Sequence, residues 1–329
     1  AGFFIGKRKK RVVHPVLRCH IDPMIAQKTL SSRAWAELVL LGTIWGGSFL
    51  SIRIALDEVG PLTSVAHRTF WAMLVLWGVV AVLRLPVPRD PRIWAAFLVM
   101  GMLNNVIPFN LMAWGQLHVE TGLTSLLNAT TALFGVIVAA LIFSDERITM
   151  RRGVGVMVGF LGVATAIGLR ELLDFDLRSL AQLAILAGTL SYAIAGSFAR
   201  LALSNLAPQI AAAGMLTGAT LVTVPLAWVT EGPISLALAP DTMLAIAYYA
   251  IIATAFAYLL YYRVLAMAGS GNLMLVTLLI PPVAIILGAL VLDEALPFSA
   301  FVGFGQLALG LLILDGRILR RVDRPHPQG

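Results

Sequence analysis

The chain has 329 residues, of which 59% are hydrophobic and only 12% are charged, with a formal net charge of +7. Its mean hydropathy of +0.88 is higher than a soluble core of this size accommodates, so the composition excludes an ordinary soluble domain. Long apolar runs rich in small residues, without strict alternation, indicate helices rather than a barrel. We therefore expect an all-α integral membrane protein.

The N-terminal stretch, residues 1–33, carries eight Lys and Arg residues and has no long apolar run before Trp35. A signal peptide needs an apolar region soon after its basic one. The sequence therefore predicts a basic cytoplasmic tail. The single cysteine, Cys19, excludes an intramolecular disulfide and argues against a thiolate metal site. We expect no metal and no cofactor.

Ten apolar segments follow the tail, and each is long enough to cross the hydrocarbon of a bilayer as a helix. Proline at a first-turn position begins three of them, where the missing N–H costs no hydrogen bond. The ten predicted helices cover residues 35–56, 62–83, 93–117, 122–143, 151–169, 179–203, 208–230, 241–267, 271–292 and 297–315.

The stretch 122–168 returns as a recognisable copy at 270–316. A shift of 148 positions carries Asp145-Glu146 onto Asp293-Glu294, Gly155 onto Gly303 and Gly162 onto Gly310. Upstream, Gly47-Ser48-Phe49 matches Gly196-Ser197-Phe198 at a shift of 149, and Pro61 matches Pro208 at 147. We interpret the chain as two five-helix repeats, 34–170 and 178–316, followed by a cytoplasmic tail, 317–329.

The basic residues predict the orientation of the helices. With a cytoplasmic N-terminus, 20 of the 24 Lys and Arg residues fall on the cytoplasmic side, as the positive-inside rule requires. This distribution explains the basic balance and argues against nucleic acid as a partner. Because each repeat holds an odd number of helices, the second repeat is inverted in the membrane. Inverted repeats around a central cavity are the architecture of alternating access.

The sequence resembles the drug/metabolite transporter superfamily, specifically its EamA-type ten-helix exporters, over residues 34–316. The motifs that carry the resemblance are Trp45-Gly46-Gly47-Ser48-Phe49, His67-Arg68-Thr69-Phe70, Tyr261-Tyr262-Arg263-Val264-Leu265, and Ile280-Pro281-Pro282 followed by Leu292-Asp293-Glu294. The resemblance implies export of small metabolites, amino acids among them, across the bacterial inner membrane. Many members carry Glu before the ninth helix's proline, whereas this chain has Ile280.

Polar and aromatic residues at mid-membrane depth are the candidates for a transport pathway, because such side chains usually turn away from lipid. The third helix holds Asn104, and also Asn110 and Trp114, which share one face at a spacing of four. The repeat carries this pair onto Tyr258 and Tyr262. We predict that these residues line one central cavity. The alternative is hydrogen bonding between helices, worth about 0.6–2 kcal/mol per contact.

Four further residues are candidates for the cavity. Asn128 and Asn272 suit cavity lining and helix packing equally, while Trp45 and Tyr192 are predicted to be interior, with an interfacial position as the alternative for Tyr192. Pro108 and the Pro281-Pro282 pair interrupt apolar runs and bend their helices. Such bends serve either as gate hinges or as static kinks.

His67 and Arg68 are the ionisable candidates within the bilayer. His67 is either a titrating proton site or a satisfied interfacial histidine. Arg68 either pairs with a substrate carboxylate or a helix carbonyl, or extends to the outer surface. No Asp or Glu lies near the middle of a predicted helix, which favours facilitated export over obligatory proton exchange.

An aromatic, weakly charged cavity suits neutral and aromatic amino acids, so we predict an exporter of these or related metabolites. The main alternative is a proton-coupled multidrug or lipophilic-cation exporter. An intramembrane enzyme is the alternative from another class. The sequence lacks His-Glu-x-x-His, Gly-x-Ser-x-Gly and paired mid-helix aspartates, so we expect no catalytic residues. The oligomeric state stays open.

Overall fold

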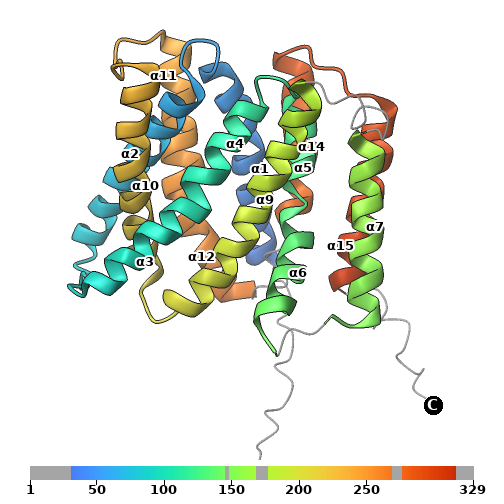
Figure 1. Cartoon of the computed structure of the whole chain (residues 1–329), viewed down its shortest axis with the longest axis horizontal. Coiled ribbons are helices and arrows are strands. Elements are labelled where there is room, and N and C mark those ends of the chain that lie inside the picture. Colours follow the sequence, from blue (N-terminus) through green and yellow to red (C-terminus); the bar gives the residue numbers. More distant parts are fainter. Residues whose placement is uncertain (1–30, 145–147, 168–176, 269–275, 316–329) are drawn as a thin grey trace, which may run out of the picture.

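The computed structural model describes residues 31–144, 148–167, 177–268 and 276–315, and within these ranges it contains helices and no strands. The helices form ten rods, as the sequence predicts, and each boundary in the described residues lies within a few positions of its predicted one (Figure 1). The rods are α1 (Ser32–Ala55), α2 (Pro61–Val82), α3–η1–α4 (Pro91–Gly115), α5–α6 (Thr121–Ile142), α7 (Met150–Ile167), α9 (Leu177–Ala202), α10 (Pro208–Glu231), α11–η2–α12 (Pro240–Ala268), α14 (Val276–Val291) and α15 (Phe298–Asp315).

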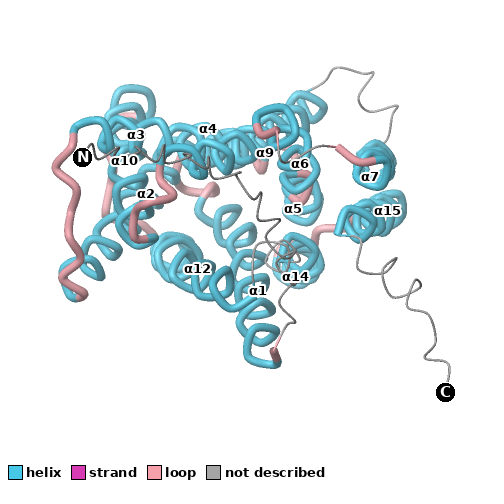
Figure 2. The backbone as a smooth tube through the Cα atoms, turned by 90° about the horizontal axis from the view of Figure 1, so that it is seen from below, coloured by secondary structure: helices cyan, strands magenta, loops and turns pink. Residues whose placement is uncertain are grey.

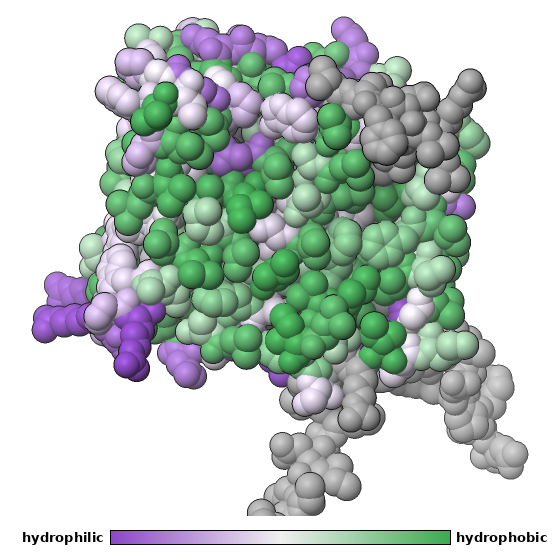
Figure 3. All heavy atoms as spheres, in the orientation of Figure 1, coloured by the Kyte–Doolittle hydropathy of each residue, from purple (hydrophilic) through white to green (hydrophobic). Residues whose placement is uncertain are grey.

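Seven of the rods are long and apolar enough to cross a membrane, and α14 and α15 are shorter apolar helices. Figure 3 shows the corresponding surface, an apolar band with hydrophilic residues gathered at its upper and lower edges. Successive rods alternate in direction, so α1 begins and α15 ends at the same face, the lower one in Figure 1. We call this the N-terminal face and the other the opposite face.

Three rods are interrupted where the sequence predicts continuous helices. The third contains a π-helical segment, η1 (Met102–Val106), between α3 (Pro91–Gly101) and α4 (Ile107–Gly115). The eighth contains η2 (Tyr248–Phe256) between α11 (Pro240–Ala247) and α12 (Ala257–Ala268). The fourth breaks between α5 (Thr121–Asn128) and α6 (Thr131–Ile142). The repeat shift of 148 places η1 within η2, so both repeats carry a π-segment at equivalent positions.

The inverted relation of the repeats is visible where α7 packs on α15, beside the main bundle (Figure 2). A Cβ added at Gly162 would lie 2.6 Å from the Gly303 carbonyl oxygen, and one added at Gly310 would lie 2.6 Å from the Gly155 carbonyl oxygen. The repeat exchanges Gly155 with Gly303 and Gly162 with Gly310, so it exchanges the two contacts as well. The fold is therefore two inverted five-helix repeats related by a pseudo-twofold axis.

Three helices that begin at the opposite face receive their N-terminal caps from the other repeat. Both carboxylate oxygens of Glu58, at 3.1 and 3.0 Å, accept from the Ala239 amide before α11. Glu231, at the end of α10, accepts from two amides of α2, and Glu294 accepts from the Thr121 amide of α5 at 3.0 Å. These carboxylates satisfy amides that have no partner within their own helix.

We predict that Gly303→Val destabilises the protein by about 1–3 kcal/mol, because the new side chain has to displace the backbone of α7. The measurement is the apparent melting temperature of purified protein in detergent. Gly305→Val is the matched control, since an added Cβ there meets nothing within 4 Å. Equal melting temperatures for the two variants would contradict the close contact of α7 and α15.

Candidate functional site

Asn104 and Asn105 of η1 and Tyr258 of α12 form a group of hydrogen-bonded side chains that we call the polar cluster. The Asn104 amide donates to the Tyr258 hydroxyl at 3.1 Å and contacts the Met215 sulfur at 3.3 Å. Asn105 donates to the same hydroxyl at 3.4 Å. Two predicted cavity residues, Asn104 and Tyr258, are thus brought together, and their bond joins the third helix of one repeat to the third helix of the other.

Arg68 points into the protein rather than out to the surface. Its Nε donates to the Thr254 hydroxyl at 2.8 Å, and its guanidinium carbon lies 3.9 Å from the centroid of the Phe109 ring. Thr254 in turn donates to the Tyr249 carbonyl five residues earlier, at 2.7 Å, as the π-segment permits. The interior position of this side chain therefore depends on one hydroxyl and one aromatic face.

Among the described residues, Arg68 makes no ion pair. A cation in low-dielectric surroundings is costly unless a counter-charge or several acceptors reach it. Its neighbour His67 is also buried, and Trp71 donates to the His67 Nδ1 at 3.3 Å. Of the two ionisable candidates, only Arg68 brings an unbalanced positive charge into the bundle.

Trp45 and Tyr192 both lie inside the protein, at different contacts. The Trp45 indole donates to the Ala253 carbonyl of η2 at 3.1 Å, which joins α1 to the π-segment. Tyr192, on α9, meets Phe109 edge-on with ring centroids 6.4 Å apart. Phe109 therefore lies against both Arg68 and Tyr192, and it is a site residue that the sequence analysis does not identify.

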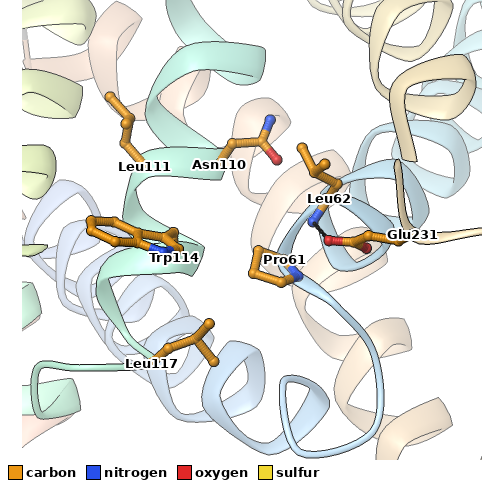
Figure 4. A pocket seen from close by; sticks show the side chains of 7 residues that line it. All are labelled: Pro61, Leu62, Asn110, Leu111, Trp114, Leu117 and Glu231. Carbon is orange, nitrogen blue, oxygen red and sulfur yellow. Dashed lines mark hydrogen bonds between the residues drawn. The ribbon is translucent and has the colours of Figure 1, made fainter. Parts of the chain in front are cut away.

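Asn110 and Trp114 line a groove that we call the first groove, with a volume of about 430 Å³ (Figure 4). The groove lies at the opposite face, between α4, the start of α2 and the end of α10. Its lining residues are Pro61, Leu62, Asn110, Leu111, Trp114, Leu117 and Glu231. Glu231 gives this groove a carboxylate, which the sequence analysis places in a loop and does not connect with the site.

Tyr262 lies in a second groove, of about 440 Å³, between α2, α10 and α12 at the N-terminal face. Its lining residues are Val79, Leu83, Pro208, Gln209, Phe256, Leu259, Leu260, Tyr262 and Arg263. The repeat carries Pro61 onto Pro208 and Trp114 onto Tyr262, so the two grooves are counterparts at the two faces. The predicted cavity residues are thus distributed over the polar cluster and two grooves.

The remaining candidates lie away from the polar cluster or outside the described residues. Asn128 ends α5 at the break in the fourth rod, and Asn272 falls outside the described residues. Pro108 stands at the start of α4, directly after η1, where its missing N–H removes one bond at a point of irregular pairing. Pro281 and Pro282 lie within α14, which continues through both. Their role as hinges stays a prediction.

A model of the EamA-like transporter family matches residues 34–168 and again 179–314. The chain belongs to the EamA-like transporter family. This membership confirms the resemblance to the drug/metabolite transporter superfamily and makes the chain a multi-pass membrane transporter of small molecules. The polar cluster and the two grooves are therefore the candidate pathway of an EamA-like transporter.

Relatives of this EamA-like chain include an uncharacterized transporter of Archaeoglobus fulgidus, 24% identical over 86% of this chain and 98% of the relative. The uncharacterized transporter YoaV of Bacillus subtilis is 20% identical over 86% of this chain and 97% of the relative. A probable terminal-alkyne amino-acid exporter of Streptantibioticus cattleyicolor is 35% identical over 41% of this chain and 44% of the relative. A solved crystal structure matches with a TM-score of 0.63 at 16% identity, over 88% of this chain and 99% of the other, and supports the fold.

We predict that Tyr258→Phe lowers stability by about 1–3 kcal/mol, because it leaves the Asn104 and Asn105 amides without their shared acceptor. The melting temperature in detergent measures this loss. Tyr261→Phe is the control, because the described contacts of Tyr261 are ring contacts with Trp45 and Tyr262, which phenylalanine keeps. A loss as large in the control would show that Tyr258 contributes through packing instead.

Proposed function

We propose that this transporter exports neutral and aromatic amino acids from the bacterial cytoplasm by alternating access. The observation that carries the proposal is Arg68, which points into the bundle and has no ion pair among the described residues. An amino acid brings the carboxylate that this guanidinium lacks. Arginine suits this role because its planar fork binds a carboxylate through two parallel hydrogen bonds.

Arg68 is oriented in a way that leaves its outer nitrogens available for such a pair. Thr254 engages Nε, and Phe109 covers one face of the guanidinium. The aromatic residues Phe109, Tyr192 and Tyr258 around it offer an apolar surface with a few polar groups, which suits a neutral or aromatic side chain. The probable terminal-alkyne amino-acid exporter of Streptantibioticus cattleyicolor, which is similar to part of this chain, supports this substrate class.

The orientation follows from the basic residues. With the N-terminal face toward the cytoplasm, Arg84, Arg89 and Arg92 flank the loop between α2 and α3 on that side, as the positive-inside rule favours. Both termini are then cytoplasmic, the second groove opens toward the cytoplasm and the first toward the outside. Two counterpart grooves on either side of one polar cluster are the arrangement that alternating access uses.

The first test is transport into proteoliposomes that contain the purified protein. We expect saturable movement of radiolabelled phenylalanine and threonine, little of glutamate or tetraphenylphosphonium, and no effect of an imposed pH gradient. Arg68→Gln should lower phenylalanine transport about tenfold or more, because a charge-assisted pair with the carboxylate is lost. Trp114→Ala should also lower phenylalanine transport, because Trp114 lines the first groove.

Arg53→Gln is the matched control, because Arg53 pairs with Asp57 one turn away and its side chain stands outside the polar cluster. Melting temperatures of all variants separate misfolding from loss of substrate binding. Proton-driven movement of tetraphenylphosphonium alone would contradict the proposal and favour a multidrug exporter, as would full phenylalanine transport by Arg68→Gln.

A further inference from the structure

The first groove carries two fixed hydrogen-bond acceptors on an otherwise mostly apolar lining (Figure 4). The acceptors are the carboxylate of Glu231 and the amide oxygen of Asn110; in the close view they lie on opposite sides of Pro61 and Leu62, and the Glu231 carboxylate points toward the Leu62 nitrogen. Glu231 is exposed and already accepts from two amides, so the buried oxygen of Asn110 is the acceptor that still needs a donor. The pair therefore points to a ligand that carries donors.

Glu231 is held firmly at the start of α2. Its Oε1 accepts from the Leu62 amide at 3.0 Å and its Oε2 from the Thr63 amide at 2.7 Å. Gly60 allows this approach, because a Cβ there would overlap the carboxylate. In the part of the chain that the structure describes, no basic side chain pairs with Glu231. A carboxylate has about four lone-pair sites, so about two remain for a ligand.

Asn110 supplies the second acceptor. Its amide nitrogen donates to the Val106 carbonyl at 2.6 Å, which fixes the orientation of the group. Its Oδ1 is buried and has no hydrogen-bond partner among the described residues. Unpaired buried acceptors are rare in native proteins and call for an explanation, of which a bound donor is the simplest.

Trp114 completes the set, one helical turn beyond Asn110 on the same side of α4. An indole ring attracts cations to its face. A carboxylate, an amide oxygen and an aromatic face together select a positively charged donor, and the leucines of the lining select an apolar body attached to it. These are the properties of a primary ammonium group on an amphipathic molecule.

The second groove provides a comparison within the same protein. The repeat places Tyr258 and Tyr262 where the first groove has Asn110 and Trp114. Counting back 147, 148 or 149 positions from Glu231 gives Arg84, Leu83 or Val82 as its repeat counterpart. None of these is acidic, so the second groove has no carboxylate at the equivalent position. Its charged lining residue is Arg263. The negative groove thus occurs at one face only.

We propose that the first groove is a binding site for the ammonium group of an amphipathic primary amine. Glu231 is the counter-ion, Asn110 accepts a hydrogen bond and Trp114 covers the cation. The proposal rests on the proposed function for its natural ligand, the ammonium end of an exported amino acid. Phosphatidylethanolamine shares the same chemistry, a primary ammonium on an apolar body, and is the other source that the test separates.

The test is equilibrium binding of radiolabelled phenethylamine, which has no carboxylate for Arg68, to the purified full-length protein in detergent. We expect Glu231→Gln to weaken binding about tenfold, because the charge of the counter-ion is lost. Glu294→Gln is the matched control: Glu294 also accepts from two amides at a helix start but does not line the groove. It should leave binding unchanged.

Asn110→Leu, which keeps the size of the side chain, should weaken phenethylamine binding severalfold at an unchanged melting temperature. Nanodiscs of phosphatidylglycerol, with or without phosphatidylethanolamine, distinguish the sources: competition by phosphatidylethanolamine that Glu231→Gln abolishes would identify lipid as an occupant of the same site. Undetectable binding to the unaltered protein, or equal losses in Glu231→Gln and Glu294→Gln, would overturn the proposal. Binding that depends on Glu231 without any phenylalanine transport would retain the site and refute the amino-acid function.

Discussion

The need to satisfy every backbone N–H and C=O without water governs this structure. Each unsatisfied group in hydrocarbon costs several kcal/mol, so the described chain within the membrane is helical, and a carbonyl in each π-segment accepts from a side chain of another helix. The Trp45 indole donates to the Ala253 carbonyl in η2, and the Ser191 hydroxyl donates to the Leu103 carbonyl in η1. The same side chains that complete the backbone of the π-segments therefore join separate helices around the polar cluster.

At the opposite face, the free N–H groups at helix starts are satisfied by side chains of the other repeat. The second and eighth rods begin with proline, which removes one unpaired donor, and neither has a side-chain cap from its own preceding residue. Glu231 and Glu58 supply the missing acceptors to these two starts from the other repeat. At the N-terminal face, by contrast, α3 is capped by its own Asp90, at 2.8 Å from the Arg92 amide. The pseudo-twofold relation of the helices thus does not extend to their caps.

Helix number, boundaries and inversion followed from the sequence because they depend on apolar length, proline position and charge, which are local or additive quantities. The repeat also identified the glycines: Gly47 lies where a Cβ would come within 2.6 Å of the Tyr248 hydroxyl, and Gly162 where it would meet the backbone of α15. Such positions are visible in a sequence because only the absence of a side chain permits the contact.

The distribution of the candidate site residues was not predictable in the same way. Asn110 and Tyr258 are repeat counterparts, but the inversion of the repeats brings them near different faces of the protein. Asn110 lines the first groove, whereas Tyr258 lies in the polar cluster. The inward position of Arg68 depends on Thr254 and Phe109, which are distant in sequence and carry no pattern of their own. The place of Glu231 in the first groove was not predictable, because in the sequence a carboxylate at the end of an apolar run looks the same as a solvated loop residue. Its contact with the start of α2 is what distinguishes it.

The π-segments give the third and eighth rods a property that uniform helices lack. A π-turn contains one residue more than an α-turn, and at 3.6 residues per turn one residue corresponds to a rotation of about 100°. If η1 tightened to α-helix, everything beyond it would turn by that angle about the rod axis relative to α3. Asn110 and Trp114 would then face a different neighbour while α3 kept its packing. A change in helical register, confined to five residues, is thus enough to re-aim the residues that α4 contributes to the first groove.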